Sequence, residues 1–155
     1  GPSCLTFSRQ NLPHQMRTPE QIAAIARGGY VLMDTVSDKI DAILIGTGSE
    51  LDLAVQAART LAAEGLAIRV VSMPCAEAFD AQPLEYRESV LPRWCRARVA
   101  IEAATADYWR KYVGLDGAVI GMDSFGASAP DKVLYAHFGF GLDRITETVR
   151  SLLAK

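Results

Sequence analysis

A buried strand followed by an amphipathic helix dominates the pattern of hydrophobic and polar positions along this chain. Residues 42–45 are all apolar, and the absence of polar alternation is typical of a strand that helices cover on both faces. The loop 46–49 contains two glycines, and beyond it apolar residues recur at helical spacing as far as residue 62. Gly65 is expected to close this helix in a left-handed conformation, and residues 66–71 form a second apolar strand. Such a β-loop-α-β unit predicts two neighbouring parallel strands.

Two capping boxes predict where helices begin. Ser49 stands three residues before Asp52, and its hydroxyl is expected to accept hydrogen bonds from free N–H groups of the first helical turn. Thr18 stands in the same relation to Gln21, and Pro19 occupies the first helical position. Both patterns therefore predict N-terminal helix caps.

The strand before the central one is expected to run antiparallel to it. Residues 30–36 and 40–45 are extended runs, and only the polar residues 37–39 join them. So short a connection suits a hairpin, in which the two strands are direct neighbours.

The remaining pattern completes an α/β fold. Apolar runs predict further strands over 98–103 and 117–122. Other expected elements are helices over 18–27, 83–91, 107–112 and 142–153, a helix starting near 128–131, an extended piece over 4–9 and an irregular segment over 74–80. We therefore predict a three-layer open sheet of about five strands, mostly parallel with one antiparallel strand, and helices on both faces.

Composition excludes several classes of protein. The 155 residues suffice for one domain, and 50% are apolar and 22% charged, as in ordinary soluble proteins. A net charge of -2 and the lack of a Lys/Arg run argue against a nucleic-acid partner, and no stretch approaches the roughly 20 apolar residues of a membrane span. Cys4, Cys75 and Cys95 are widely spaced, which favours a reducing, cytoplasmic compartment over disulfides or a zinc site. Residues 1–3 have the composition of a protease-cleavage scar.

The loop Gly46, Thr47, Gly48 and Ser49 is one candidate binding site. It lies between a strand and a helix N-terminus, where free N–H groups can hold an anion such as phosphate. It lacks the lysine of a P-loop and the third glycine of a dinucleotide fingerprint. A tight turn that only packs the helix on the sheet is the simpler interpretation.

No residue pattern predicts a catalytic or metal centre. Glu102 ends a predicted parallel strand, where ligands bind in open α/β sheets, but no second acid stands at an informative spacing. A solvated or capping role is the simpler interpretation. His14 and His137 have no nucleophile or paired metal ligand nearby in sequence, and the aromatic residues in 108–112 suit packing better than a stacking platform.

A series of short motifs, in order, resembles the C-terminal domain of transketolase. The matching stretches are SRQNLP (8–13), GGYV (28–31), IGTGSE (45–50), RVVSMP (69–74), YRESVLP (86–92), ADYW (106–109), KYVG (111–114) and FGASAP (125–130). Each motif alone is weak, but together they cover almost the whole chain after residue 3. One departure is Ala104, where the family pattern has a glycine, and it affects only the expected geometry of that turn.

The resemblance implies a parent enzyme that transfers a two-carbon ketol unit from a ketose phosphate to an aldose phosphate, a step of the pentose phosphate pathway. It implies a homodimer with thiamine diphosphate and a divalent metal, Mg or Ca, held by domains outside this chain. Arg9 of the SRQ motif resembles the arginine that binds the substrate phosphate. No catalytic, cofactor or metal residue is implied within the chain, so the fragment alone is expected to be inactive.

The resemblance also implies a division of the chain. Residues 4–18 would end the preceding domain and form a linker, and residues 19–155 would form the C-terminal domain, which supports packing and oligomerisation. Two alternatives remain: a regulatory module that binds an anion or other ligand through the loop 46–49, and the equivalent domain of another thiamine enzyme, such as deoxyxylulose-phosphate synthase or the β chain of pyruvate dehydrogenase. The SRQNLP and ADYW motifs favour transketolase.

Overall fold

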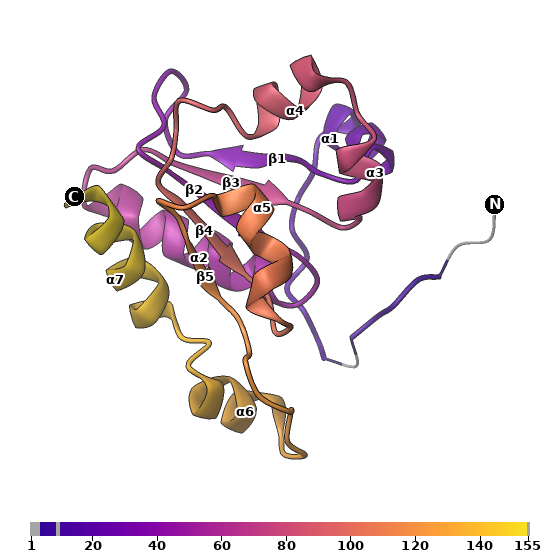
Figure 1. Cartoon of the computed structure of the whole chain (residues 1–155), viewed down its shortest axis with the longest axis vertical. Coiled ribbons are helices and arrows are strands. Elements are labelled where there is room, and N and C mark those ends of the chain that lie inside the picture. Colours follow the sequence, from indigo (N-terminus) through magenta and orange to yellow (C-terminus); the bar gives the residue numbers. More distant parts are fainter. Residues whose placement is uncertain (1–3, 9, 155) are drawn as a thin grey trace.

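The computed structural model describes residues 4–8 and 10–154, and its strands form one mixed sheet (Figure 1). The strands are β1 (Tyr30–Asp34), β2 (Ala42–Gly46), β3 (Ile68–Ser72), β4 (Arg98–Ile101) and β5 (Ala118–Ile120). Their order is β1-β3-β2-β4-β5, and all neighbours are parallel except β1, which is antiparallel to β3. This arrangement confirms the predicted five-stranded α/β fold.

Helices cover both faces of the sheet. They are α1 (Pro19–Ala24), α2 (Glu50–Ala63), α3 (Ala76–Asp80), α4 (Leu84–Val90), α5 (Arg110–Val113), α6 (Asp131–Phe138) and α7 (Leu142–Leu153), with 3-10 turns η1 (Ile25–Arg27) and η2 (Ala106–Trp109). The helix α3 was not expected, because the sequence indicated an irregular segment over 74–80. Five residues are too few for helical periodicity to show, and one of them, Phe79, is buried in the core.

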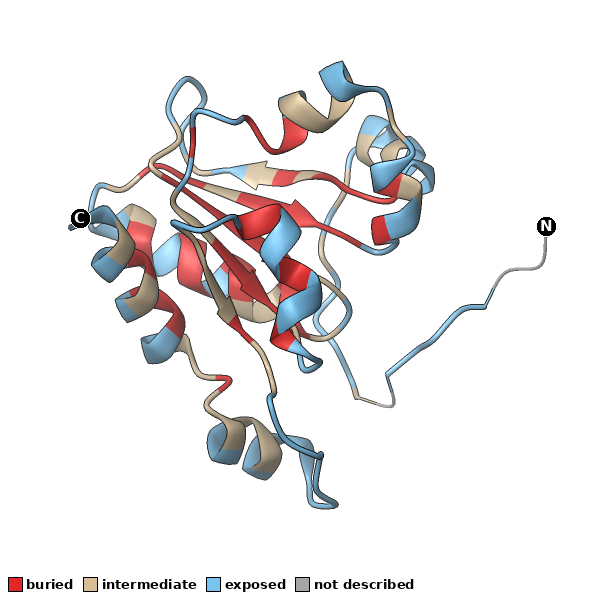
Figure 2. Cartoon of the chain, in the orientation of Figure 1, coloured by how far each residue is buried: buried red, intermediate tan, exposed pale blue. Residues whose placement is uncertain are grey.

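The side chains of β2 divide the core into two layers. Leu44 packs with residues of α2 and α7 on one face, whereas Ile43 and Ile45 pack with residues of α3, η2 and α5 on the other. Every residue of β2 is buried, as the unbroken apolar run predicted. Figure 2 shows this buried centre, with the more exposed N-terminal segment and α6 at the periphery.

The hairpin prediction for β1 and β2 is wrong. β1 is antiparallel to the central strand in direction, but its neighbour is β3, with Tyr30 opposite Ser72. β2 is already paired on both sides, by β3 and β4, so no edge is free for β1. The connection 35–41 carries the chain past β3, and Thr35 holds it there, since its N–H donates to the carbonyl of Ile68 at 2.9 Å.

The two predicted caps have different outcomes. Thr18 forms the full capping box with Gln21, since each backbone N–H donates to the other residue's side-chain oxygen. Ser49 does not cap α2, so that prediction is wrong. Its backbone is already helical, with φ -69° and ψ -29°, and its hydroxyl donates to Glu50 Oε1 instead. At the end of α2, Gly65 has φ +88° and closes the helix as predicted.

The ends of the chain differ from the compact sheet region. Residues 4–8 have no regular structure, so the strand expected over 4–9 does not form in its described part, and Arg9 lies outside the described residues. The segment that carries α6 projects from the body, and α6 itself has no buried residue (Figure 1). Within the described residues, no helix combines the length and apolar character needed to cross a membrane.

Candidate functional site

A cavity of about 820 Å³ opens at the carboxyl ends of β2, β3 and β4. β3 lies on one side of the central strand β2 and β4 on the other, so the direction of the crossover reverses between β2 and β4. Ligands bind at such a reversal in open α/β sheets. Thr47, Cys75, Glu102 and Trp109 line the cavity from four segments of the chain. This cavity is therefore the candidate functional site.

The predicted anion loop is divided between two hollows. Thr47 lines the candidate site, whereas Gly48 and Ser49 line a separate hollow of about 290 Å³. Gly46 permits a close approach, because a Cβ atom at that position would lie 2.9 Å from the Cα atom of Leu51. The geometry therefore suits a packing turn between β2 and α2, and the anion contact stays a prediction.

Glu102, which follows β4, lies at the same edge of the sheet as a second carboxylate, that of Glu50. Glu50 begins α2, is 4% exposed, and accepts hydrogen bonds from the hydroxyls of Tyr135 at 2.5 Å and Ser49 at 3.1 Å. Glu102 Oε2 is buried, with no hydrogen-bond partner among the described residues. Burial, with a smaller contribution from the charge of Glu50, raises the pKa of Glu102 to about 7. The expectation that the carboxylate of Glu102 is solvated was therefore wrong.

The presence of two acidic residues at this edge of the sheet was missed because no spacing rule relates two residues so far apart in the chain. The available signal was positional. Glu50 follows the loop after β2, Glu102 directly follows β4, and the carboxyl ends of parallel neighbouring strands meet at one edge of the sheet.

We expect Glu102→Gln to stabilise the chain by about 1–2 kcal/mol at pH 8 and to change its stability little near pH 4. The value at pH 8 is reduced to allow for partial solvent screening of the carboxylate. The folded-state pKa of about 7 lies above the ordinary value of 4.5. The folded chain therefore holds the proton more tightly, and stability falls as the pH rises from 4.5 through 7. Glutamine mimics the protonated form and removes this loss. Urea midpoints at the two pH values measure the effect.

The matched control for this prediction is Glu85→Gln, at an exposed position on α4. It should change stability by less than about 0.5 kcal/mol at both pH values. If Glu102→Gln gave the same change at pH 4 and pH 8, Glu102 would not hold a proton in the folded chain near neutral pH.

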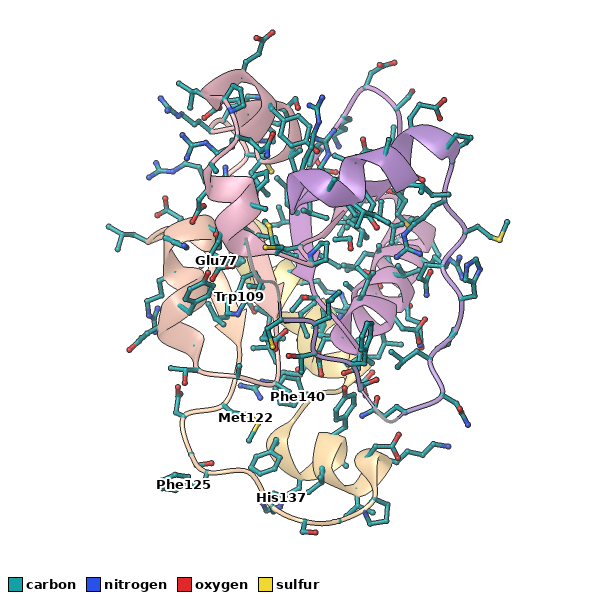
Figure 3. All side chains as sticks on the ribbon, turned by 90° about the vertical axis from the view of Figure 1, so that its right-hand side faces the viewer. Glu77, Trp109, Met122, Phe125, His137 and Phe140 are labelled. Carbon is teal, nitrogen blue, oxygen red and sulfur yellow. The ribbon has the colours of Figure 1, made fainter. Side chains whose placement is uncertain are left out.

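Aromatic residues form one wall of the candidate site. Trp109 and Tyr108 line the cavity, and Trp109 is 5% exposed and packs in the core, as expected, whereas Tyr108 is 44% exposed. Tyr112, which is also 5% exposed, packs in the core behind them and does not line this cavity. The Tyr108 hydroxyl donates to Glu77 Oε1 at 3.3 Å across the cavity wall. Figure 3 shows Glu77 and Trp109 close together on this side of the molecule. The wall is therefore mainly core packing, with Tyr108 as its accessible edge.

Other polar groups do not assemble into a metal centre. His14 and His137 are both exposed, and the ring of His137 stands edge-on to Phe138 on the projecting segment seen in Figure 3. Cys4, Cys75 and Cys95 are free thiols. Across residues 4–8 and 10–154, no three His, Cys, Asp or Glu side chains are grouped closely enough to hold a metal ion.

Comparison with known protein families shows to which family this chain belongs. The family described as "Transketolase-like TK C-terminal domain" matches residues 28–141, more than half of the chain. The chain belongs to the transketolase family. It is 56% identical over 154 residues to transketolase 1 of Vibrio vulnificus and 56% identical over 153 residues to transketolase 1 of Escherichia coli. Each match covers 99% of this chain and 23% of the relative, so the chain spans about a quarter of the length of these transketolases.

Solved transketolase structures share the fold. The transketolase of Leishmania mexicana superposes with a TM-score of 0.78 at 42% identity, over 86% of this chain and 19% of that one. A Pichia stipitis transketolase in complex with sedoheptulose 7-phosphate has a TM-score of 0.80 at 34% identity, over 94% and 20%. These neighbours agree with the mixed five-stranded sheet and with the transketolase C-terminal domain that the ordered motifs indicated.

Proposed function

We propose that this chain serves as the C-terminal domain of a transketolase that transfers a two-carbon ketol unit from a ketose phosphate to an aldose phosphate in the cytoplasm. The observation that supports it most is the 56% identity to transketolases over almost every residue of the chain. The relatives extend far beyond the matched region, since it makes up only 23% of their length. The transfer reaction is assigned to the complete protein.

The domain division follows the same proposal. Residues 4–18 would complete the preceding domain and lead out of it, and residues 19–155 would form the packing and dimer-supporting domain. Arg9 would bind the phosphate of the sugar substrate through two parallel N–H donors of its guanidinium. The SRQNLP motif supports this role of Arg9.

The described residues do not fit the family's cofactor. Thiamine enzymes hold the diphosphate through a divalent metal, and no cluster of metal-binding side chains exists within the described ranges. The resemblance to transketolase implies instead that thiamine diphosphate and Mg or Ca are held by the other domains, at a dimer interface. Within this chain, the residues would position and support those domains.

The loop Gly46 to Ser49 is proposed as a weak anion contact only. Free N–H groups at the start of α2 attract an anion, with a contribution of about 0.3–1 kcal/mol at an exposed terminus. Glu50 and Asp52 already place two carboxylates in that first turn and oppose a further negative charge. A regulatory function that rests on this loop is correspondingly less well supported than the transketolase assignment.

We expect the chain alone neither to bind thiamine diphosphate nor to transfer ketol units. The physical reason is that the cofactor performs the chemistry and the protein must position it, which requires the domains that this chain does not match. Calorimetric titration with thiamine diphosphate and magnesium, together with a coupled ketol-transfer assay, measures both properties.

A complete transketolase provides the positive control for both measurements. Saturable cofactor binding by the chain, or turnover above a heat-denatured sample, would contradict the assignment of the cofactor site to other domains.

A further inference from the structure

A second cavity, of about 500 Å³, lies between α4 and α5 on one face of the sheet. It differs in position from the candidate functional site. Arg98, the first residue of β4, lines it, whereas the candidate site is lined by Glu102 beyond the other end of that strand. Figure 1 shows α4 and α5 on the same side of the sheet. The two cavities therefore lie toward opposite ends of β4.

The helix α4 supplies one wall of this cavity. Leu84, Arg87 and Glu88 line it, and their spacing of three and four residues places them on a single helical face. Leu91, which directly follows the helix, also lines the cavity. The sequence therefore directs both cationic and apolar groups into the same space. Arg93 follows α4 and is 73% exposed, so the cavity is open to solvent on that side.

Two of the four cations around the cavity are neutralised by neighbours. Lys111 Nζ lies 2.6 Å from Asp80 Oδ2, and Arg93 Nε lies 2.6 Å from Glu88 Oε1. These pairs use the only two carboxylates that line the cavity among the described residues. The lining therefore retains an excess of positive charge.

The other two cations are Arg87 and Arg98. Arg98 donates to the backbone carbonyls of Cys95, Tyr112, Leu91 and Pro92 at 2.7–3.2 Å, which hold its guanidinium in place without cancelling its charge. Burial lowers the pKa of Arg98, because the charged guanidinium loses part of its hydration there.

Arg87 completes the positive wall. Its Nε is buried and has no hydrogen-bond partner among the described residues. Arg87 also forms no ion pair with a carboxylate among the described residues, so its positive charge is not neutralised. The remaining walls are apolar or aromatic and include Phe79, Leu84, Leu91 and the ring of Tyr112.

We propose that this cavity binds a small organic phosphate that carries an apolar or aromatic group. Four cations and two carboxylates leave an excess of two positive charges, which matches a phosphate monoester with a charge of about -1.5 to -2 at pH 7. Arg87 and Arg98 supply positive charges that no carboxylate of the described residues neutralises, and the apolar walls contact the organic group. The site is independent of the ketol-transfer chemistry proposed above.

Phenyl phosphate is the probe for this proposal. It is titrated into the 155-residue chain at low ionic strength, and NMR follows the Nε–Hε signals of the arginines and the backbone amide signals. We expect saturable shifts of Arg87, Arg98 and the amides of α4, with a Kd on the order of 1 mM. Inorganic phosphate, which lacks the apolar group, should bind about three- to tenfold more weakly. Benzoate, with a single charge, should also bind more weakly than phenyl phosphate.

Variants separate the site from general electrostatics. Arg87→Gln should weaken phenyl phosphate binding about tenfold, because it removes a charged donor. Leu84→Glu places a carboxylate at the rim, at a position that is 50% exposed, and should weaken binding without removing either guanidinium. The matched control is Arg96→Gln, a 73% exposed arginine paired with Asp116 outside this cavity, which should leave the Kd unchanged.

Several outcomes would overturn the proposal. One is the absence of saturable shifts up to about 50 mM phenyl phosphate, which is far above the expected Kd. The others are equal affinity of the Arg87→Gln and wild-type chains for phenyl phosphate, and equal affinity of the wild-type chain for benzoate and phenyl phosphate. Shifts confined to the amides of residues 47–51 would assign the anion to the loop before α2 and would equally exclude the cavity.

Discussion

Replacing Arg9 by alanine in a complete transketolase that carries this chain is expected to lower kcat/KM for phosphorylated sugars by about 10–100-fold. A hydrogen bond to a charged group contributes roughly 1.5–3 kcal/mol, and about 1.4 kcal/mol corresponds to a tenfold change. Because the phosphate lies far from the reacting carbons, most of the loss should appear as a higher KM. Steady-state kinetics with matched phosphorylated and unphosphorylated acceptors measure the effect.

Two comparisons test the assigned phosphate contact. Unphosphorylated acceptors offer the guanidinium nothing to bind, so their kcat/KM should hardly change. Arg9→Lys keeps the charge but loses the two parallel donors, and it should fall between the wild type and Arg9→Ala. If both classes of acceptor lost activity equally, Arg9 would have a structural role and the phosphate contact would be wrong.

Gly28→Ala is expected to destabilise the chain by about 2–5 kcal/mol, the largest loss that we expect from a single methyl group. Gly28 has φ +84°, which disfavours any side chain. A Cβ atom there would also lie 2.1 Å from the carbonyl oxygen of Cys75 and 2.5 Å from the nitrogen of Phe79. Both are backbone atoms, so relieving the clash requires α3 to move. Urea unfolding measures the loss.

Gly65→Ala is the matched control for Gly28→Ala. Gly65 has nearly the same backbone angle, φ +88°, but a Cβ atom at Gly65 would meet nothing within 4 Å. Gly65→Ala should therefore lower the free energy of unfolding only by the backbone strain, about 1–2 kcal/mol. Equal losses in the two variants would show that Gly28 does not pack closely against α3.

The sequence by itself determined the elements whose signals are local. The apolar run 42–45 indicated a strand buried on both faces, and β2 is buried throughout. Thr18 and Gln21 indicated a capping box, and both hydrogen bonds form. These predictions succeeded because each depends on residues that are neighbours in the chain, where spacing alone sets which groups meet. The ordered motifs also indicated the transketolase family, since eight short stretches in one order are far more specific than any one of them.

Only the tertiary structure decided which distant segments became neighbours. The polar connection after β1 suggested a hairpin with β2, but β3 and β4 occupy both edges of β2, so β1 pairs with β3. Ser49 had the pattern of a cap, yet a buried Glu50 beside it takes its hydroxyl. Glu50 and Glu102 come to one edge of the sheet because β2 and β4, which precede them, are parallel neighbours. The positive cavity arises in the same way, since Arg87 and Arg98 come from different elements. Such contacts depend on strand order and packing across the sheet, which no local spacing in the sequence specifies.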